Sequence, residues 1–233
     1  MYNTFVQNNF MQLTLLQMDY SYLPEVYDKD PYSNKKFRFS LDQELTIDEF
    51  LSKKGITAFY KICVNELKTE KEYLDGLNQK NKNTIPFKYV PLKSVIHRYN
   101  RKGQLVYILT FDSYVVKIGI STDSMKGRMG SYNAGRREYR KTGTPSTTNF
   151  HVTEAIHTAL RDGKKVEWYV YDAPDKVVDV DYFGTGEIRQ EKANYVSTLE
   201  AGLIEDYVEL AGHHPILSKN CGKTKKKTKK KKS

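Results

Sequence analysis

Three polar side chains with different chemistry stand in the mostly apolar stretch Leu105–Arg128, namely Tyr107, Lys117 and Arg128. The guanidinium group of an arginine is planar and always charged, so it suits a phosphate or another anion. A free phenol titrates at about pH 10, so a tyrosine can act as a base at neutral pH only when a nearby cation favours its ionised form. A tyrosine close to a lysine and an arginine could therefore move a proton beside a bound anion.

The elements that would position these side chains can be predicted from the same stretch. Two apolar runs, Leu105–Phe111 and Tyr114–Ile120, flank the pair Asp112-Ser113. Both runs are rich in β-branched and aromatic residues, which predicts two strands joined as a hairpin. A helix carrying Arg128 should follow, because a capping residue is available at Ser121, Thr122 or Asp123.

The register of the hairpin decides whether Tyr107 and Lys117 can act together. A two-residue turn at Asp112-Ser113 pairs Phe111 with Tyr114, and it therefore pairs position 107 with position 118. Lys117 would then point to the opposite face of the sheet, because successive side chains alternate between faces. A turn one residue longer, or a bulge, would align 107 with 117, so we expect the simplest register to be wrong here.

The rest of the chain predicts an α+β fold with a small, mostly antiparallel sheet flanked by helices. Residues 1–84 read as an N-terminal arm and a helical lobe, in which apolar stripes over 45–51, 56–67 and 73–77 indicate two or three helices. A Pro-punctuated extended segment covers 85–95. Beyond the hairpin we expect a helix ending near 133–135, a helix over 152–160, strands over 165–171 and 176–183, and a helix over 195–211. The main domain would span 85–221.

Composition narrows the class of protein. The net charge of the 233-residue chain is +10, but eight lysines lie in 223–232, within a tail (222–233) that we expect to be disordered. Such a tail either adds non-specific attraction to phosphates or is simply solvated. No apolar run is long enough for a membrane span and no signal peptide is apparent, so we expect a soluble cytoplasmic protein. The only cysteines are Cys63 and Cys221, which indicates neither a disulfide framework nor a thiolate zinc site.

Several motifs occur in an order that resembles the GIY-YIG nucleases, and specifically their type II restriction endonuclease branch. The tripeptides Val106-Tyr107-Ile108 and Lys117-Ile118-Gly119 match the two signature strands, and Arg128 matches the arginine of the following helix. The segment STLEAGLIEDYVELAGHHPILSKN then supplies a glutamate, an apolar pair, a proline and an asparagine. Two positions depart from the pattern, since Val106 replaces a glycine and Lys117 replaces the second tyrosine. Some restriction enzymes of the family resemble this chain in carrying that lysine.

The resemblance implies a site-specific endonuclease of a restriction system that hydrolyses double-stranded DNA with one Mg²⁺ ion. Glu200 would hold the metal, because Mg²⁺ prefers oxygen ligands and retains several waters. Tyr107 would be the general base aided by Lys117, and Arg128 would grip the scissile phosphate. Tyr132 would hydrogen-bond the phosphate or the water, and Asn220 would orient the network on the metal side. A homodimer is expected, because symmetric subunits suit the cutting of both strands of a palindrome.

A long basic loop follows the expected helix that carries Arg128. Basic side chains next to an aromatic one suit contact with DNA, although an ordinary charged surface loop has the same composition. The candidates for DNA binding are Arg136, Arg137, Arg140 and Lys141.

Three other interpretations remain open. The segments HVTEAIHTAL and VEWY resemble a phage-type or homing branch of the same superfamily, in which Glu154, His157 and Glu167 would be candidates for the metal site. A non-catalytic nucleic-acid-binding protein could use the 18 tyrosines as stacking surfaces. A zinc hydrolase built on the histidines is disfavoured, because they lack the spacing of a zinc-binding helix. The sequence patterns alone would also fit purely structural roles. Tyr107 would then be an ordinary tyrosine of a core strand, Lys117 a lysine on the solvent face of its strand, and Glu200 an exposed helix glutamate.

Overall fold

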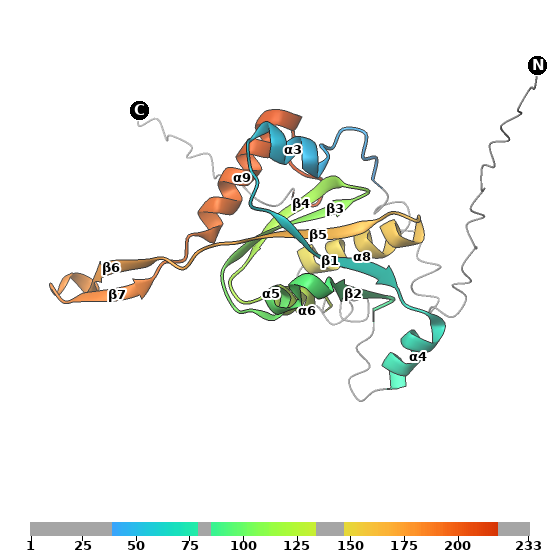
Figure 1. Cartoon of the computed structure of the whole chain (residues 1–233), viewed down its shortest axis with the longest axis horizontal. Coiled ribbons are helices and arrows are strands. Elements are labelled where there is room, and N and C mark those ends of the chain that lie inside the picture. Colours follow the sequence, from blue (N-terminus) through green and yellow to red (C-terminus); the bar gives the residue numbers. More distant parts are fainter. Residues whose placement is uncertain (1–38, 79–84, 134–146, 219–233) are drawn as a thin grey trace, which may run out of the picture.

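The computed structural model describes residues 39–78, 85–133 and 147–218, and Figure 1 shows how their elements are arranged. In chain order these are α3 (Ile47–Lys53), β1 (Tyr60–Leu67), α4 (Glu70–Asn78), β2 (Phe87–Pro91), a 3-10 turn (Lys93–Val95), α5 (Ile96–Asn100), β3 (Leu105–Phe111), β4 (Tyr114–Ser121), α6 (Met125–Asn133), α8 (Thr147–Arg161), β5 (Val166–Asp172), β6 (Val177–Asp181), a second 3-10 turn (Tyr182–Gly184), β7 (Ile188–Lys192) and α9 (Val196–Ala211).

A five-stranded sheet with the order β2-β1-β5-β3-β4 forms the centre of the molecule. Each neighbouring pair of strands in it is antiparallel. Helices α5, α6 and α8 pack on one face, around Tyr107, Tyr132 and Trp168. Helices α3 and α9 pack on the other face, around Ile108 and Tyr207 (Figure 1). The predicted α+β class, with an antiparallel sheet between helices, is therefore confirmed.

The hairpin β3–β4 departs from the simplest register, as expected. Asp112 and Ser113 both have positive φ, as a tight hairpin turn requires, and Phe111 pairs with Tyr114. The register then shifts, so that Leu109 pairs with Lys117 and Tyr107 pairs with Gly119. This is a β-bulge, in which one extra residue is inserted into one strand. The expected alignment of 107 with 117 was wrong in detail, but residues two apart share a face, so both side chains lie on the same side of the sheet.

The second predicted helix of the N-terminal region was wrong. Residues 56–67 have apolar positions at helical spacing, yet Tyr60–Leu67 forms β1, which lies between β2 and β5. Pairing on both sides satisfies its backbone, and Ile62 and Cys63 are buried against the helices of one face. Long-range pairing has thus overridden a local pattern. The helices predicted on either side are present as α3 and α4, and the division of the chain after residue 84 stays a prediction.

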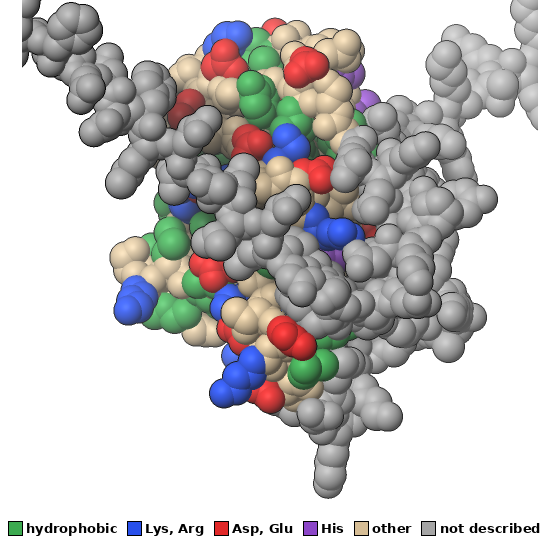
Figure 2. Space-filling view, turned by 90° about the vertical axis from the view of Figure 1, so that its right-hand side faces the viewer, with side chains coloured by type: hydrophobic (Ala, Val, Ile, Leu, Met, Phe, Trp, Pro, Cys, Tyr) green, Lys and Arg blue, Asp and Glu red, His purple; other side chains and the backbone are tan. Residues whose placement is uncertain are grey.

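The predicted strand over 176–183 is found as β6, but it does not join the central sheet. It pairs with β7, a strand that the sequence pattern did not predict, and the two form an arm that projects away from the body (Figure 1). On the opposite side of the molecule, acidic and basic side chains are mixed among apolar and neutral ones (Figure 2). In the described part of the chain, no helix is long and apolar enough to span a membrane.

Candidate active site

Three of the side chains predicted to form a site, Tyr107, Arg128 and Tyr132, are joined by hydrogen bonds. The hydroxyl oxygens of Tyr107 and Tyr132 are 2.5 Å apart. Arg128 donates to the Tyr107 hydroxyl from Nε (3.3 Å) and Nη2 (3.1 Å), and to the Tyr132 hydroxyl from Nη2 (3.0 Å). Arg128 and Tyr132 are four residues apart on α6, so they lie on one face of the helix, above Tyr107 on β3. Both tyrosines are fully buried and Arg128 is half-buried.

Trp168 supports the two phenols from the central strand β5. Its ring centroid is 5.6 Å from that of Tyr107 and 5.7 Å from that of Tyr132. The indole Nε1 donates a hydrogen bond of 2.6 Å to Oδ1 of Asn65 on β1, so the indole is fixed on its far side as well. Trp168 and Asn65 were not predicted as site residues. Only the insertion of β5 between β1 and β3 brings them to this place.

Gly119 is the cross-strand partner of Tyr107, and its lack of a side chain makes room for the phenol. A Cβ atom at this position would overlap the hydroxyl oxygen and the Cζ atom of Tyr107. Tyr107 is packed against Trp168 on its other side, so it cannot move away without disturbing the core. The glycine of the second tripeptide therefore holds the Tyr107 hydroxyl in its position under Arg128.

Lys117 is buried in β4, with its side chain 3% exposed, and Nζ lies 3.5 Å from the carbonyl oxygen of Leu217. The segment 215–218 runs along the outer edge of β4. Leu217 N–H donates to the carbonyl of Val116 at 2.8 Å, and the Ser218 hydroxyl accepts from Ile118 N–H at 3.1 Å. The C-terminal segment therefore fixes Lys117 from the edge of the sheet. Asn220 lies outside the described residues.

Glu200 is a half-buried residue near the start of α9. Burial raises the pKa of its carboxyl group above the usual range, while the positive charges of Lys117 and Arg128 act in the opposite direction. Both cations are therefore near enough to act on this carboxylate. Within the described ranges, no group of three or more histidine, cysteine, aspartate or glutamate side chains could hold a metal ion. A lone carboxylate still fits Mg²⁺, which is commonly held by one or two carboxylates together with waters and substrate phosphates.

The electrostatic surroundings of Tyr132 and Arg128 fix the protonation state of both groups. Burial raises the pKa of Tyr132 well above its usual value, and the neighbouring Tyr107 adds to the effect. Burial opposes the ionisation of Arg128, but the two phenols outweigh it and raise the pKa of the guanidinium. Tyr132 therefore keeps its proton and Arg128 its charge, so both can donate hydrogen bonds to the Tyr107 oxygen.

The remaining predicted residues lie on α8, on β5 or outside the described part of the chain. Glu154 and His157 are buried on α8, whereas Glu167 on β5 points to the sheet face opposite Trp168. The Glu167 carboxylate pairs with Lys61 at 2.8 Å, so it does not form one metal site with the α8 residues. The predicted DNA-binding residues lie outside the described part of the chain, as does the lysine tail; they are Arg136, Arg137, Arg140 and Lys141.

Comparison with known proteins gave matches among solved structures. No family model and no curated protein matches this chain. The restriction endonuclease HPY188I in complex with product DNA covers 79% of this chain and 90% of its own, with 22% identity and a TM-score of 0.47. A mutant of bacteriophage T4 EndoII covers 71% of this chain and 95% of its own, with 19% identity and a TM-score of 0.43.

Proposed function

We propose that this protein is a site-specific double-stranded DNA endonuclease of the type II restriction kind, with Mg²⁺ as its cofactor. The observation that carries the proposal is the position of the Tyr107 hydroxyl between the Tyr132 hydroxyl and the Arg128 guanidinium. Glu200 lies within electrostatic range of Arg128 and Lys117. Tyr107 as the base, Arg128 as the phosphate ligand and Glu200 as the metal ligand would together supply the groups that phosphodiester hydrolysis needs.

Tyr107 is the proposed general base. Arg128 donates hydrogen bonds to its oxygen, and the Tyr132 hydroxyl can donate another, so both would stabilise negative charge there. The ammonium group of Lys117, on the same face of the hairpin, adds positive charge. The Tyr107 oxygen would take a proton from the attacking water, whose oxygen then forms the new bond to phosphorus as the bond to the 3′ oxygen breaks.

Arg128 is the proposed phosphate ligand. Three of the five N–H donors of an arginine serve the phenols here, which leaves its Nη1 amino group for a phosphate oxygen. The guanidinium would thereby stabilise the additional charge that develops on the phosphate during attack. The partial exposure of Arg128 allows such a ligand to reach it.

Glu200 is the proposed metal ligand. A cation bound there would neutralise charge on the phosphate and assist the departing 3′ oxygen. Lys117 and Arg128 favour the ionised carboxylate that binding requires. Arg136, Arg137, Arg140 and Lys141 directly follow α6 in sequence, so we propose that they contact the DNA beside the site, and that Asn220 orients the metal side.

Incubation of supercoiled plasmid with the purified protein, with and without Mg²⁺, tests the proposal. We expect discrete fragments only with Mg²⁺, and we expect Tyr107→Phe to slow cleavage by about 10²- to 10³-fold while DNA binding is retained. Tyr114→Phe, in the same hairpin, is the matched control and should cleave normally. Intact plasmid with the wild-type protein, at all Mg²⁺ concentrations, would refute the function.

A further inference from the structure

The arm formed by β6 and β7 exposes more apolar surface than its size would suggest. Every residue of the two strands is exposed, and the exposed fractions of Val177, Ile188 and Phe183 are 62%, 62% and 87%. A two-stranded hairpin that packs on nothing is at best marginally stable in water. A contiguous exposed apolar surface of this kind usually marks an interaction site.

The tip of the arm presents an aromatic side chain at the expense of backbone strain. Phe183 has φ of +52°, a conformation that bulky residues rarely adopt. Its ring packs edge-on against Tyr182, at 4.6 Å between centroids, and Arg189 stacks on Tyr182 at 3.4 Å. These contacts hold the tip in shape, yet Phe183 remains almost wholly exposed. Nothing within the described part of the chain offsets the strain by burying this ring.

The root of the arm is fixed by one buried glutamine, Gln104. The main-chain carbonyl oxygen of Gln104 accepts a hydrogen bond of 3.0 Å from the N–H of Ala173, which precedes the arm. Its side-chain amide donates to the carbonyl of Ala193 at 2.6 Å and accepts from Tyr195 N–H at 3.3 Å, after the arm ends. Both ends of the arm are thus tied to the start of β3, so the tip is held at a defined place.

An apolar cavity of about 340 Å³ opens next to this root. Two residues of the cavity wall flank the arm in the sequence. Tyr171 lies near the end of β5, just before the arm, and Leu199 lies in α9, just after the arm. The cavity is large enough for an aromatic side chain, and its apolar lining includes Ile56, Phe59, Val106, Tyr171, Leu199 and Leu203.

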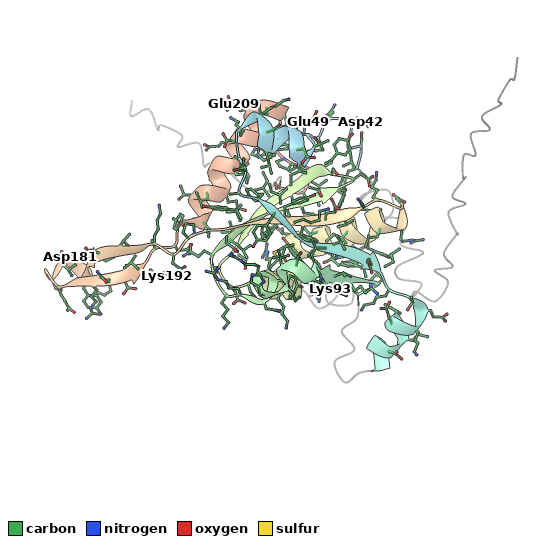
Figure 3. The ribbon with its side chains drawn as sticks, viewed as in Figure 1. Asp42, Glu49, Lys93, Asp181, Lys192 and Glu209 are labelled. Carbon is green, nitrogen blue, oxygen red and sulfur yellow. The ribbon has the colours of Figure 1, made fainter. Side chains whose placement is uncertain are left out.

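Charge is distributed unevenly along the arm. The half that includes the tip carries three acidic residues and one basic residue, Asp179, Asp181, Glu187 and Arg189. The root and the loop before Gln104 carry four basic residues and two acidic ones, Arg101, Lys102, Lys176, Lys192, Asp175 and Glu191. Figure 3 shows Asp181 near the tip and Lys192 near the root. An acidic tip is repelled by the DNA backbone, whereas it complements the basic root of a second copy of the chain.

We propose that the arm is a self-association element through which two copies form a symmetric dimer. The two arms lie antiparallel across a two-fold axis, so the acidic tip of each meets the basic root of the other. Phe183 of each copy then enters the apolar cavity beside the root of its partner. The role of this dimer rests on the proposed function, because two active sites are needed to cut both strands of a palindromic site.

The oligomeric state tests the dimer directly. We expect sedimentation of the wild-type protein at micromolar concentrations to give a dimer, and Phe183→Asp to weaken dimerisation by about 30-fold or more, as for a central hot-spot residue. Leu74→Asp, at an exposed apolar residue of α4, is the control and should remain dimeric. Because Phe183 is exposed, its variant should retain the melting temperature of the wild-type monomer.

A second variant tests the cavity from the receiving side. A Cβ atom at Gly202 on α9 meets open space, and Gly202 lines the cavity, so Gly202→Leu should fill it without disturbing the helix. We expect this variant to dimerise as weakly as Phe183→Asp. A wild-type monomer, or a Phe183→Asp variant that stays dimeric, would overturn the proposal. A variant that remains dimeric but binds DNA less tightly would assign the arm to DNA.

Plasmid cleavage separates this inference from the proposed function. A monomeric Phe183→Asp variant should still nick supercoiled plasmid in the presence of Mg²⁺, but it should not linearise the plasmid in one binding event. If wild-type protein and variant differ in oligomeric state while neither cuts DNA, the dimer stands and the nuclease proposal fails. If both linearise plasmid equally well, the dimer proposal fails.

Discussion

The described part of the chain contains two antiparallel hairpins, β3–β4 and β6–β7, that differ in almost every other respect. All seven residues of β3 are buried, and β3–β4 lies within the sheet with helices on both faces. All residues of β6 and β7 are exposed, and among the described residues that hairpin is attached to the body at its root. Packing on both faces gives β3–β4 the rigidity needed to hold the Tyr107 hydroxyl against Arg128 and Tyr132 of α6. The arm instead presents side chains to a partner, so substitutions in the two hairpins should have different consequences.

The largest expected effect concerns Glu200. Glu200→Gln removes the proposed metal ligand and should slow cleavage by about 10³-fold, since a bound cation contributes several kcal/mol to such reactions. DNA binding should be retained. Because burial raises the pKa of Glu200, its ionised form is disfavoured in the folded state, so the variant should melt at a higher temperature at neutral pH but not in acid. Plasmid cleavage and thermal unfolding measure both effects.

Glu205→Gln provides the matched control for this substitution. Glu205 is exposed on the same helix, so neither cleavage nor the melting temperature should change. If the Glu200→Gln variant cleaves as fast as the wild type, Glu200 is not the metal ligand, and Glu154 and His157 become the next candidates.

The second prediction compares the hairpins by stability alone. Ile108→Ala, in the fully buried β3, should reduce the free energy of unfolding by about 2–5 kcal/mol, because it leaves a cavity in the core. Val180→Ala, in the exposed β6, should change the free energy of unfolding by less than about 0.5 kcal/mol. Denaturant titration of both variants, at concentrations where the protein is monomeric, measures the difference. Similar losses would mean that the arm is part of the cooperative core.

The third prediction concerns the contact between Gly119 and Tyr107. Gly119→Ala should destabilise the protein by about 1–3 kcal/mol, the usual cost of overpacking. It should also slow cleavage by up to about 10²-fold, because it displaces the Tyr107 hydroxyl. Gly103→Ala is the control, since a Cβ atom there meets open space. Cleavage and unfolding of both variants test it, and an unaffected Gly119→Ala variant would contradict the described packing.

The smallest expected effect is a shift of the pH profile. With the pKa of Glu200 raised, the carboxylate becomes protonated at a pH above the usual carboxyl range of about 4. Cleavage should therefore fall on the acid side by about tenfold per pH unit below that raised pKa. Higher Mg²⁺ concentrations should move the fall to lower pH, because the cation binds only the ionised form. If the pH at which cleavage falls does not change with Mg²⁺ concentration, protonation of Glu200 is not the cause of the fall.

Local patterns predicted the elements around the site, and they failed where long-range pairing decides. The β3–β4 strands and α9 were predicted because their apolar residues coincide with the buried faces, and α6 was predicted from the capping residues that follow the hairpin. The need to bring Lys117 to the Tyr107 side correctly indicated an irregular register. In contrast, β7 has the sequence IRQEK, in which no apolar alternation marks a strand, because nothing buries it.

The contacts that complete the site could not be predicted from spacing. Trp168 and Asn65 reach the phenols only because β5 lies between β1 and β3, an order that no local signal encodes. The anchoring of Lys117 by the Leu217 carbonyl depends on the C-terminal segment returning to the edge of β4. The order of motifs supplied the candidate residues, and the topology determines their surroundings.

Leu217 and Ser218 lie along β4 and thereby also cover the edge of the sheet against pairing with strands of other copies. An outermost strand with open amides is a template for uncontrolled stacking of further chains. Here the main-chain N–H of Leu217 and the hydroxyl group of Ser218 occupy those positions on either side of Lys117. Loss of this segment would leave the margin of the sheet open to aggregation and release the lysine at the same time, so solubility and chemistry depend on the same few residues.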